Sequence, residues 1–288
     1  MKKLLSLLMT AALVISFAGC SSSTTASKQS ASANPSSGTA DRSWEKVKSS
    51  GKLVLGLDKA FPPMGYIDTK TGHLVGFDID LAQEACKRLG IQLKLQPIDW
   101  NSKTAELNNG NVDCLWNGFS RTPKRAKEFT LSIPYMNNHQ ILLIKSGSSC
   151  QGLDSLKGKT VGVQSDSSAE TALNNNADFK KSLKSIVKID DYSKAVLEIQ
   201  NGTIDAIAID EIVARYYLTK NPGAYTILKD KNGKDASLAT EDYVVAVRKS
   251  DLTLRDKINS ALKAMAKDGT MAKISKKWFG TDVTTVGK

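Results

Sequence analysis

The segment IQNGTIDAIAID, residues 199–210, combines the features that decide the fold. It begins with the end of an amphipathic helix, and Gly202 fits a helix C-cap, where positive φ is needed. Residues 203–210 are then apolar at nearly every position, which is typical of a parallel strand buried on both faces. The segment therefore predicts a helix that leads directly into a central strand of a parallel sheet.

An earlier segment, LNNGNVDCLWN (residues 107–117), follows the same order: helix end, Asn-Gly, two residues, Asp and buried strand. Such joints are common in α/β proteins, so chance is an alternative explanation of the repeat. In each segment the carboxyl end of the strand delivers a polar residue, Asn117 or Asp210. Open parallel sheets bind ligands beyond those ends. The two segments thus predict two related lobes and the edge of each lobe that would face a ligand.

Strand and helix patterns alternate along the rest of the folded part. We expect strands at 52–58, 91–98, 159–164 and 185–190, and a helix around 102–108. Residues 72–90 predict a strand and then a helix, with Asp78 as a possible cap and Gly90 as the stop. This alternation indicates βαβ units and parallel sheets.

Two helix starts carry groups that would bind an anion. Thr122 is a favoured N-cap and Pro123 is favoured at the first helical position. The free N–H groups of such a helix end, the Ser120 hydroxyl and the Arg125 guanidinium all suit a carboxylate. Alternatively, Arg125 pairs with a surface acid such as Glu128.

The matching helix start in the second half lies in VGVQSDSSAE, residues 161–170. Ser167 and Glu170 fit a capping box, which makes Ser168 the first helical residue. Asp210, at the end of a buried strand, would be costly without a partner and suits an ammonium group. Carboxylate and ammonium sites around one cleft suggest an α-amino acid. Phe61 and Trp100 are available as aromatic walls, although plain core packing is an alternative for each.

The N-terminus has the pattern of a secretory signal peptide, residues 1–19, with a basic start and an apolar run. Cys20 follows Ala18-Gly19 and resembles the lipidated cysteine of a bacterial lipobox; a soluble secreted protein with an incidental cysteine is the alternative. The segment from residue 20 to 43 is mostly Ser, Ala, Thr, Gly, Asn and Pro, and we expect a flexible tether.

Composition limits the classes of function. The 288-residue chain has 40 Lys and Arg against 29 Asp and Glu, a formal net charge of +11. The basic residues are scattered and no aromatic-basic motif is present, so nucleic-acid binding is not expected. Two histidines and no CxxC spacing give little support to a metal site. No cofactor is expected. A disulfide among Cys86, Cys114 and Cys150 is possible, and nothing in the pattern requires one.

The stretch FPPMGY…LVGFDIDLAQEACKRLG…DCLWNGFSRTPKRAKEF…PYM resembles the bacterial extracellular solute-binding proteins of family 3, the polar amino-acid receptors of ABC importers. The resemblance continues through NGTIDAIAIDE and YVVAVRKSD and spans about residues 44 to 281. It implies an α/β fold of two lobes, the type II periplasmic-binding-protein-like fold, in which each lobe is a mainly parallel sheet flanked by helices. Two hinge strands join the lobes. We expect residues 44–138 with 240–281 to form lobe 1, residues 139–239 to form lobe 2, and residues 282–288 to form a tail.

The resemblance also implies roles for single residues. Arg125, Ser120 and Ser168 match carboxylate ligands, while Asp210 and the Gly118 carbonyl match the ammonium acceptors. Phe61 and Trp100 match an aromatic pair around the ligand side chain, and Asp58 a position near that side chain. Asn117 and Asp166 depart from the family pattern, in which a small residue and Gly are common. Asn117 is included in the predicted ligand site as a residue that could set specificity, whereas Arg121 has no assigned role.

The resulting hypothesis is a receptor, not an enzyme, that binds an L-amino acid with a basic, polar or cystine-like side chain. Its expected partners are an ABC permease with its ATPase and the membrane, through a lipid anchor at Cys20. The protein would be a monomer on the outer face of the cell membrane, more in keeping with a Gram-positive cell. Two alternatives are a ligand-sensing module for a membrane signalling partner and a dehydratase-like enzyme on the same fold. Asp58, Asp99, Asp166 and Glu211, all expected near the cleft, favour a cationic ligand.

Overall fold

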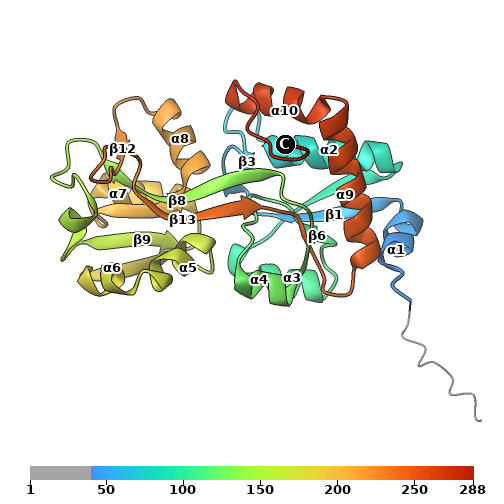
Figure 1. Cartoon of the computed structure of the whole chain (residues 1–288), viewed down its shortest axis with the longest axis horizontal. Coiled ribbons are helices and arrows are strands. Elements are labelled where there is room, and N and C mark those ends of the chain that lie inside the picture. Colours follow the sequence, from blue (N-terminus) through green and yellow to red (C-terminus); the bar gives the residue numbers. More distant parts are fainter. Residues whose placement is uncertain (1–39) are drawn as a thin grey trace, which may run out of the picture. The chain divides into compact units, whose positions relative to one another are not determined.

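The computed structural model describes residues 40 to 288, and Asp41–Lys288 form one compact unit. This unit consists of two lobes that are connected by a pair of long strands (Figure 1). The predicted signal peptide, the lipidation site Cys20 and residues 20–39 of the predicted tether lie outside the described residues. None of the helices between residues 40 and 288 is long and apolar enough to cross a membrane.

The first lobe is built on a five-stranded sheet. Its strand order is β5 (Gln92–Pro97), β1 (Lys52–Leu57), β6 (Cys114–Leu115), β14 (Ala246–Val247) and β7 (Thr130–Leu131). β1 pairs in parallel with both β5 and β6, whereas β14 joins β6 and β7 in antiparallel fashion. The sheet is therefore parallel on one side and antiparallel where the chain returns.

Helices and a small second sheet complete the first lobe. The helices are α1 (Ser43–Ser50), α2 (Phe77–Leu89), α3 (Lys103–Asn108), α4 (Pro123–Glu128), α9 (Leu252–Lys267) and α10 (Thr270–Phe279), with the 3-10 turn η1 (Trp100–Ser102). The small antiparallel sheet contains β2 (Ala60–Phe61), β3 (Gly65–Ile67) and β4 (Leu74–Val75).

The second lobe has a sheet of six strands. The path is β10 (Ser185–Ile189), β9 (Thr160–Gln164), β11 (Ala206–Asp210), β8 (Met136–Lys145) and β12 (Tyr225–Ile227), and β13 (Ser237–Tyr243) also pairs with β8. β9 is parallel to β10 and β11, and all five residues of β11 are buried, as the sequence predicts. The helices are α5 (Ser168–Asn175), α6 (Ala177–Ser182), α7 (Tyr192–Asn201) and α8 (Glu211–Lys220), with the turn η2 (Leu153–Leu156).

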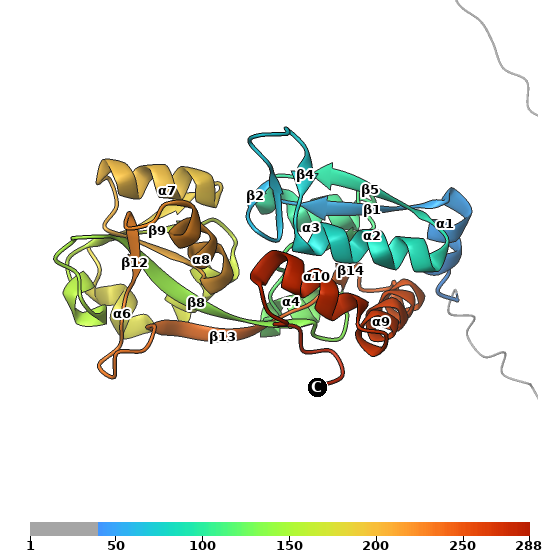
Figure 2. The ribbon, with the colours of Figure 1, turned by 90° about the horizontal axis from the view of Figure 1, so that it is seen from above.

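The strands β8 and β13 run antiparallel from one lobe to the other (Figure 2). The predicted lobe boundaries, 138/139 and 239/240, fall inside these two strands. The C-terminal segment meets the same crossing, because Thr284 forms a bridge with Met136 and Thr285 donates a backbone hydrogen bond to Tyr135.

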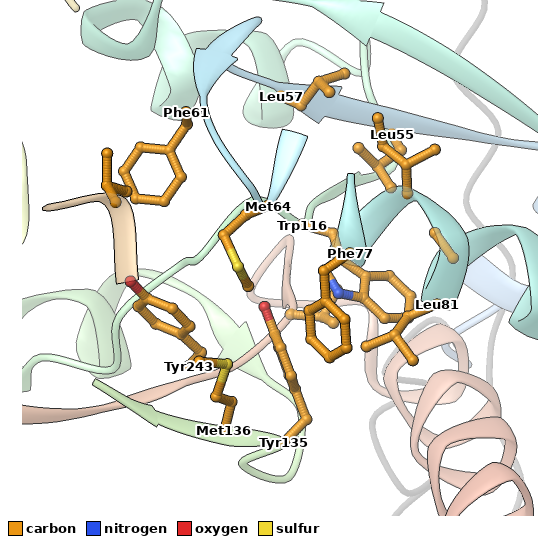
Figure 3. Close-up of a cluster of buried hydrophobic side chains, with 14 of the residues drawn as sticks. Leu55, Leu57, Phe61, Met64, Phe77, Leu81, Trp116, Tyr135, Met136 and Tyr243 are labelled. Carbon is orange, nitrogen blue, oxygen red and sulfur yellow. The ribbon is translucent and has the colours of Figure 1, made fainter. Parts of the chain in front are cut away.

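Aromatic and aliphatic side chains fill the core of the first lobe (Figure 3). Trp116, the residue after β6, lies with its ring centroid 6.2 Å from that of Tyr135. Phe77, the first residue of α2, lies 6.4 Å from the same ring. This packing fixes the residues directly before the loop that begins at Asn117. Cys86, Cys114 and Cys150 are buried free thiols, so no disulfide joins them.

The cap predicted for α2 is wrong. The helix begins after Gly76, and its N-cap makes no side-chain hydrogen bond. A Cβ atom at Gly76 would lie 2.1 Å from the Met64 carbonyl oxygen, so only glycine fits this close approach. Asp78 is instead fully buried, and its Oδ2 accepts hydrogen bonds from Gly118 N at 2.6 Å and the Tyr135 hydroxyl at 3.0 Å. Burial raises the pKa of Asp78 to about 7.

Candidate ligand-binding site

The loop from Asn117 to Thr122 brings the first group of polar residues to the lobe interface. Thr122 caps α4, since its Oγ1 accepts a hydrogen bond from Arg125 N at 3.2 Å, and Pro123 begins the helix. Both features agree with the sequence prediction. Because Arg125 lies in the first turn of α4, its side chain is fixed close to Ser120 in the preceding loop.

Arg125 is a buried cation that no carboxylate of the described residues contacts. Its side chain is 6% exposed, Nη1 donates to the Ser120 carbonyl at 3.1 Å, and Nη2 donates to the Asp166 carbonyl at 3.3 Å. Arg125 takes part in none of the ion pairs found within residues 40–288, and Glu128 pairs with Lys124. Burial lowers the pKa of the guanidinium. The arrangement suits an incoming anion, because a buried charge is costly until it is paired.

The second lobe places a helix start opposite Arg125. Ser167 caps α5 by accepting a hydrogen bond from Glu170 N, so Ser168 is the first helical residue, as predicted. The hydroxyl oxygens of Ser120 and Ser168 are 2.9 Å apart, and Gln140 Nε2 donates to Ser168 Oγ at 3.1 Å. The two hydroxyl groups therefore meet across the lobe interface.

Asp210 supplies a buried carboxylate at the end of β11. Its Oδ1 accepts three hydrogen bonds, from Asn138 Nδ2 at 2.7 Å, Gln140 Nε2 at 2.8 Å and the Tyr243 hydroxyl at 2.7 Å. Its Oδ2 receives none of these three. Burial, followed by the charge of Glu241, raises the pKa of Asp210 to about 7, and Arg125 acts in the opposite direction. The free oxygen and the buried charge suit a cationic partner such as an ammonium group.

An acidic pocket of about 280 Å³ lies at the same interface. Asp58, Asp99 and Trp100 from the first lobe and Asp190 and Asp191 from the second contribute to its lining. Asp58 is buried, and its Oδ2 accepts a hydrogen bond from Gln164 Nε2 of the second lobe at 2.7 Å. Burial raises the pKa of Asp58 to about 6, and the charges of Asp191 and Asp99 add to that effect.

Two other acidic residues that were expected near the cleft, Asp166 and Glu211, are not among the residues that line this pocket. Glu211 does not line this pocket; it borders a separate depression and accepts a hydrogen bond from Arg215 Nε at 2.6 Å. Asp166 pairs with the Lys103 ammonium. The acidic character of the pocket therefore comes from Asp190 and Asp191 in their place. Sequence reasoning missed both, because a DD pair before a helix also fits an N-cap, which Asp191 indeed provides.

Aromatic rings border the site. Phe61 lies 5.8 Å from Tyr192 of the second lobe, centroid to centroid, and Trp100 lies 6.1 Å from Phe119. Phe61 and Tyr243 are seen in Figure 3 at one edge of the buried cluster. Phe61 thus reaches the lobe interface, and Trp100 lines the acidic pocket.

Asn117 and Gly118 fix the positions of two other residues of the site, Asp58 and Phe61. Asn117 Oδ1 accepts a hydrogen bond from Asp58 N at 2.9 Å, and its Nδ2 would be 2.6 Å from a Cβ atom at Gly65. Asn117 therefore fixes the backbone of Asp58. Gly118 has φ +55, and a Cβ atom there would be 2.6 Å from the Phe61 ring.

Several residues of the site carry no motif that sequence reasoning could have used. Asn138, Gln140 and Tyr243 come from the crossing strands, where polar residues are unremarkable in sequence. Gln164 ends β9 at the edge where a parallel sheet binds ligands, which was a usable signal. Lys103, in the first turn of α3, gave none.

Comparisons by family, by sequence and by structure all match this chain to solute-binding proteins. A model of "Bacterial extracellular solute-binding proteins, family 3" matches residues 53–281. The arginine-binding extracellular protein ArtP of Bacillus subtilis is 33% identical over 97% of this chain and 98% of its own length. The L-cystine-binding protein TcyJ of Escherichia coli is 31% identical over 83% and 86%. A substrate-binding protein of an ABC uptake transporter from Streptococcus pneumoniae, solved with bound histidine, superposes with a TM-score of 0.80 at 36% identity, covering 85% of this chain and 99% of that one.

Proposed function

Because the chain belongs to the bacterial extracellular solute-binding proteins of family 3, we propose that it is the extracytoplasmic receptor of an amino-acid ABC importer. It captures an L-amino acid between its lobes and delivers it to a membrane permease that an ATPase drives. The observation that carries this proposal is the pair of buried opposite charges, Arg125 and Asp210, in one site. The carboxylate and ammonium of a free amino acid are complementary to that pair. The family and the two-lobed fold predicted from the sequence are confirmed.

The proposed roles follow from the donors and acceptors in the site. The ligand carboxylate accepts hydrogen bonds from the Arg125 guanidinium and from the hydroxyl groups of Ser120 and Ser168, since guanidinium and hydroxyl groups are donors. The ammonium donates to Asp210 and to the carbonyl of Gly118. In the proposed complex, Phe61 and Trp100 border the ligand side chain.

Ligand entry requires the lobes to separate. The Ser120–Ser168 contact and the Gln164–Asp58 hydrogen bond both join side chains of different lobes. An amino acid that enters between them replaces protein contacts by its own, so it stabilises a closed form that contains it. A ligand shifts the equilibrium between open and closed forms only by its differential affinity for them.

The acidic pocket favours a ligand with a cationic side chain. Asp58, Asp99, Asp190 and Asp191 line it, and among the described residues Lys59 is the one basic residue of the lining. A guanidinium or a second ammonium group there would neutralise part of this charge and would favour the ionised form of Asp58. Arginine and lysine are the best candidates. Cystine, whose far end carries another ammonium group, is the next.

We further propose that the protein does no covalent chemistry and that Cys20 carries a lipid anchor. The relatives named above are binding proteins. A dehydratase-like enzyme would convert its ligand, so an unchanged amino acid after long incubation supports the receptor over that alternative. A permease and ATPase gene beside this one would favour the importer over the signalling module. Release of a Cys20→Ala variant from the membrane fraction would support the anchor.

Isothermal titration calorimetry of the purified protein tests the proposal. We expect one site per chain for L-arginine, L-lysine or L-cystine among a panel of amino acids, and Arg125→Ala should remove measurable binding. The matched control is Arg121→Ala, because Arg121 is an exposed arginine of the same loop. The assignment is wrong if Arg125→Ala binds as the unmodified protein does, or if the control loses binding equally.

A further inference from the structure

Lys103 forms a buried contact across the lobe interface. It lies in the first turn of α3 in the first lobe and is 2% exposed. Its Nζ donates to the Trp100 carbonyl at 3.1 Å and to the Asp166 carbonyl at 2.9 Å, and it forms an ion pair with the Asp166 carboxylate. Asp166 belongs to the loop between β9 and α5 of the second lobe, so this ion pair exists only when the lobes are together.

Asp166 has an unusual backbone conformation. Its φ is +52, which makes it the one residue other than glycine with positive φ within residues 40–288. The left-handed region is unfavourable for residues that have a Cβ atom, although Asp and Asn tolerate it better than most. Glycine would take this conformation without strain. The residue with the strained backbone is therefore the one whose carboxylate pairs with the buried Lys103.

The same residue also contacts Arg125, the residue proposed to bind the ligand carboxylate. The Asp166 carbonyl accepts from Arg125 Nη2 at 3.3 Å as well as from Lys103 Nζ. Its backbone N–H donates to Glu170 Oε2 at 2.8 Å, which ties the loop to the first turn of α5. Asp166 is therefore the point of the second lobe at which both buried cations of the first lobe are bound.

The positive charges of Lys103 and Arg125 repel each other, and the Asp166 carboxylate offsets this repulsion. Burial and then the positive charge of Arg125 lower the pKa of Lys103 to about 8, whereas Asp166 raises it. Lys124 and Glu128 face the same small cavity, together with Thr104, Thr122 and Thr171. The Asp166 carboxylate is the acid that contacts Lys103, so Arg125 is left without an acid and can bind the ligand.

We propose that Lys103 and Asp166 are positioning residues that hold the lobes closed and keep Arg125 directed at the ligand carboxylate. This inference rests on the proposed function in one respect, because it assumes that the lobes close around an amino acid. The pair contributes to the lifetime of the closed form, not to recognition of the ligand itself. Its loss should therefore increase the rate of ligand dissociation and leave the association rate nearly unchanged.

Asp166→Gly separates this role from a merely structural one. The substitution removes the carboxylate and also relieves the left-handed strain. Without ligand the lobes can separate and expose Lys103 to water, so we expect an unchanged or higher melting temperature. We also expect L-arginine, used as the probe in stopped-flow measurements, to dissociate roughly ten times faster, because a buried lysine then lacks its counter-ion. Lys103→Met with Asp166→Gly should dissociate more slowly than Asp166→Gly alone, since no unpaired charge remains. Lys124→Met is the control, because Lys124 borders the same cavity and, among the described residues, forms its ion pair with Glu128 of its own helix and none across the interface.

A second measurement keeps the inference independent of the ligand. Spin labels at Ser49→Cys and Lys181→Cys, one exposed site in each lobe, report the distance between the lobes without added amino acid. Asp166→Gly should move this distance distribution toward longer values. If no amino acid binds but the distribution shifts, the proposed function fails, whereas the part of the inference that concerns lobe closure stands. If dissociation and the distance distribution both match those of the unmodified protein, or if only the melting temperature falls, the inference is wrong.

Discussion

Arg125 and Asp210 influence each other although no ion pair joins them. Burial lowers the pKa of Arg125 and raises that of Asp210, whereas each charge acts on the other in the direction that restores its ionised form. Each group keeps neutral hydrogen-bond partners, carbonyl oxygens for Arg125 and amide and phenol donors for Asp210. A zwitterion between them would therefore add charge-assisted hydrogen bonds without displacing an existing ion pair.

Gly118 is a residue at which a single methyl group should disturb the site. Its φ is +55, and a Cβ atom would lie 2.6 Å from Phe61 Cε1 and 3.2 Å from Tyr243 Cζ. We expect Gly118→Ala to lower the free energy of unfolding by about 1–3 kcal/mol, because strain and overpacking both contribute. Displacement of the Phe61 ring should also weaken amino-acid binding. Denaturant unfolding and calorimetry measure the two effects.

Gly110 provides the comparison for this substitution. It has φ +79, and no atom lies within 4 Å of an added Cβ. Gly110→Ala should therefore show only the backbone strain, about 1 kcal/mol, and bind amino acids normally. Equal effects of the two alanine substitutions on binding would contradict the proposed closeness of Gly118 to the ligand.

Local sequence signals located single residues well when the partner was close in sequence. Thr122, Ser167 and Gly202 were predicted as caps, and each acts within a few residues of itself. Asp78 was predicted wrongly, because its partners, Gly118 and Tyr135, are 40 and 57 residues away. The hydrogen bond that Asn117 accepts from the backbone of Asp58 was not predicted for the same reason, because the two residues are 59 positions apart.

At the scale of elements, two short helices meet at the site through their N-terminal ends. α4 carries Arg125 and α5 carries Ser168, and both helices begin at a side-chain cap. A helix of six residues has few hydrogen bonds of its own, so its start depends on the cap and on packing. The position of Arg125 should therefore depend on Thr122.

Thr122→Ala tests this dependence. The substitution removes the acceptor for Arg125 N and should lower the free energy of unfolding by about 1 kcal/mol. It should also weaken amino-acid binding, because the first turn of α4 orients the guanidinium. Thr122→Ser keeps the acceptor and should behave like the unmodified protein in both measurements. A Thr122→Ala variant that loses stability but binds with full affinity would show that the cap does not position Arg125.

The sheets were predictable because apolar runs and helix stops report burial directly. The strands 52–58, 91–98 and 159–164 are matched by β1, β5 and β9, while the strand at 203–210 begins later, at Ala206. The antiparallel returns of β8 and β14 into the sheets could not be derived in this way. They join segments that are far apart in sequence, as in the Ala206–Ile144 and Ala246–Leu115 pairs, which are separated by 62 and 131 residues.

At the scale of the whole molecule, the lobes are linked both by continuous chain segments and by noncovalent side-chain contacts. β8 and β13 form the covalent link, whereas Ser120–Ser168, Gln164–Asp58 and Lys103–Asp166 can form only on closure. No sequence pattern identifies such pairs, because their members lie on different lobes and depend on how the lobes meet. Binding and closure should therefore be coupled through this small number of polar contacts.

Protonation should affect stability and binding in opposite directions. Asp58, Asp78 and Asp210 have pKa values of about 6, 7 and 7 in the folded protein, against an ordinary value of 3.8. Between about pH 4 and 7 the folded state thus holds more protons than the unfolded state, so stability falls as pH rises. Each pKa unit corresponds to about 1.4 kcal/mol. Without added ligand, the melting temperature should rise as the pH is lowered from 8 to 5.

The increase in melting temperature that a saturating amino acid produces should show the reverse trend. The ligand ammonium needs the ionised form of Asp210, and protons compete for that form below about pH 7. Bound ligand raises stability by mass action, so a lower affinity gives a smaller increase. Asp78→Asn should flatten the first trend and leave the second intact, because Asp78 is buried beneath the site and would not contact the ligand. An increase with L-arginine that grows from pH 8 to pH 5 would contradict the assignment of Asp210 to the ammonium group.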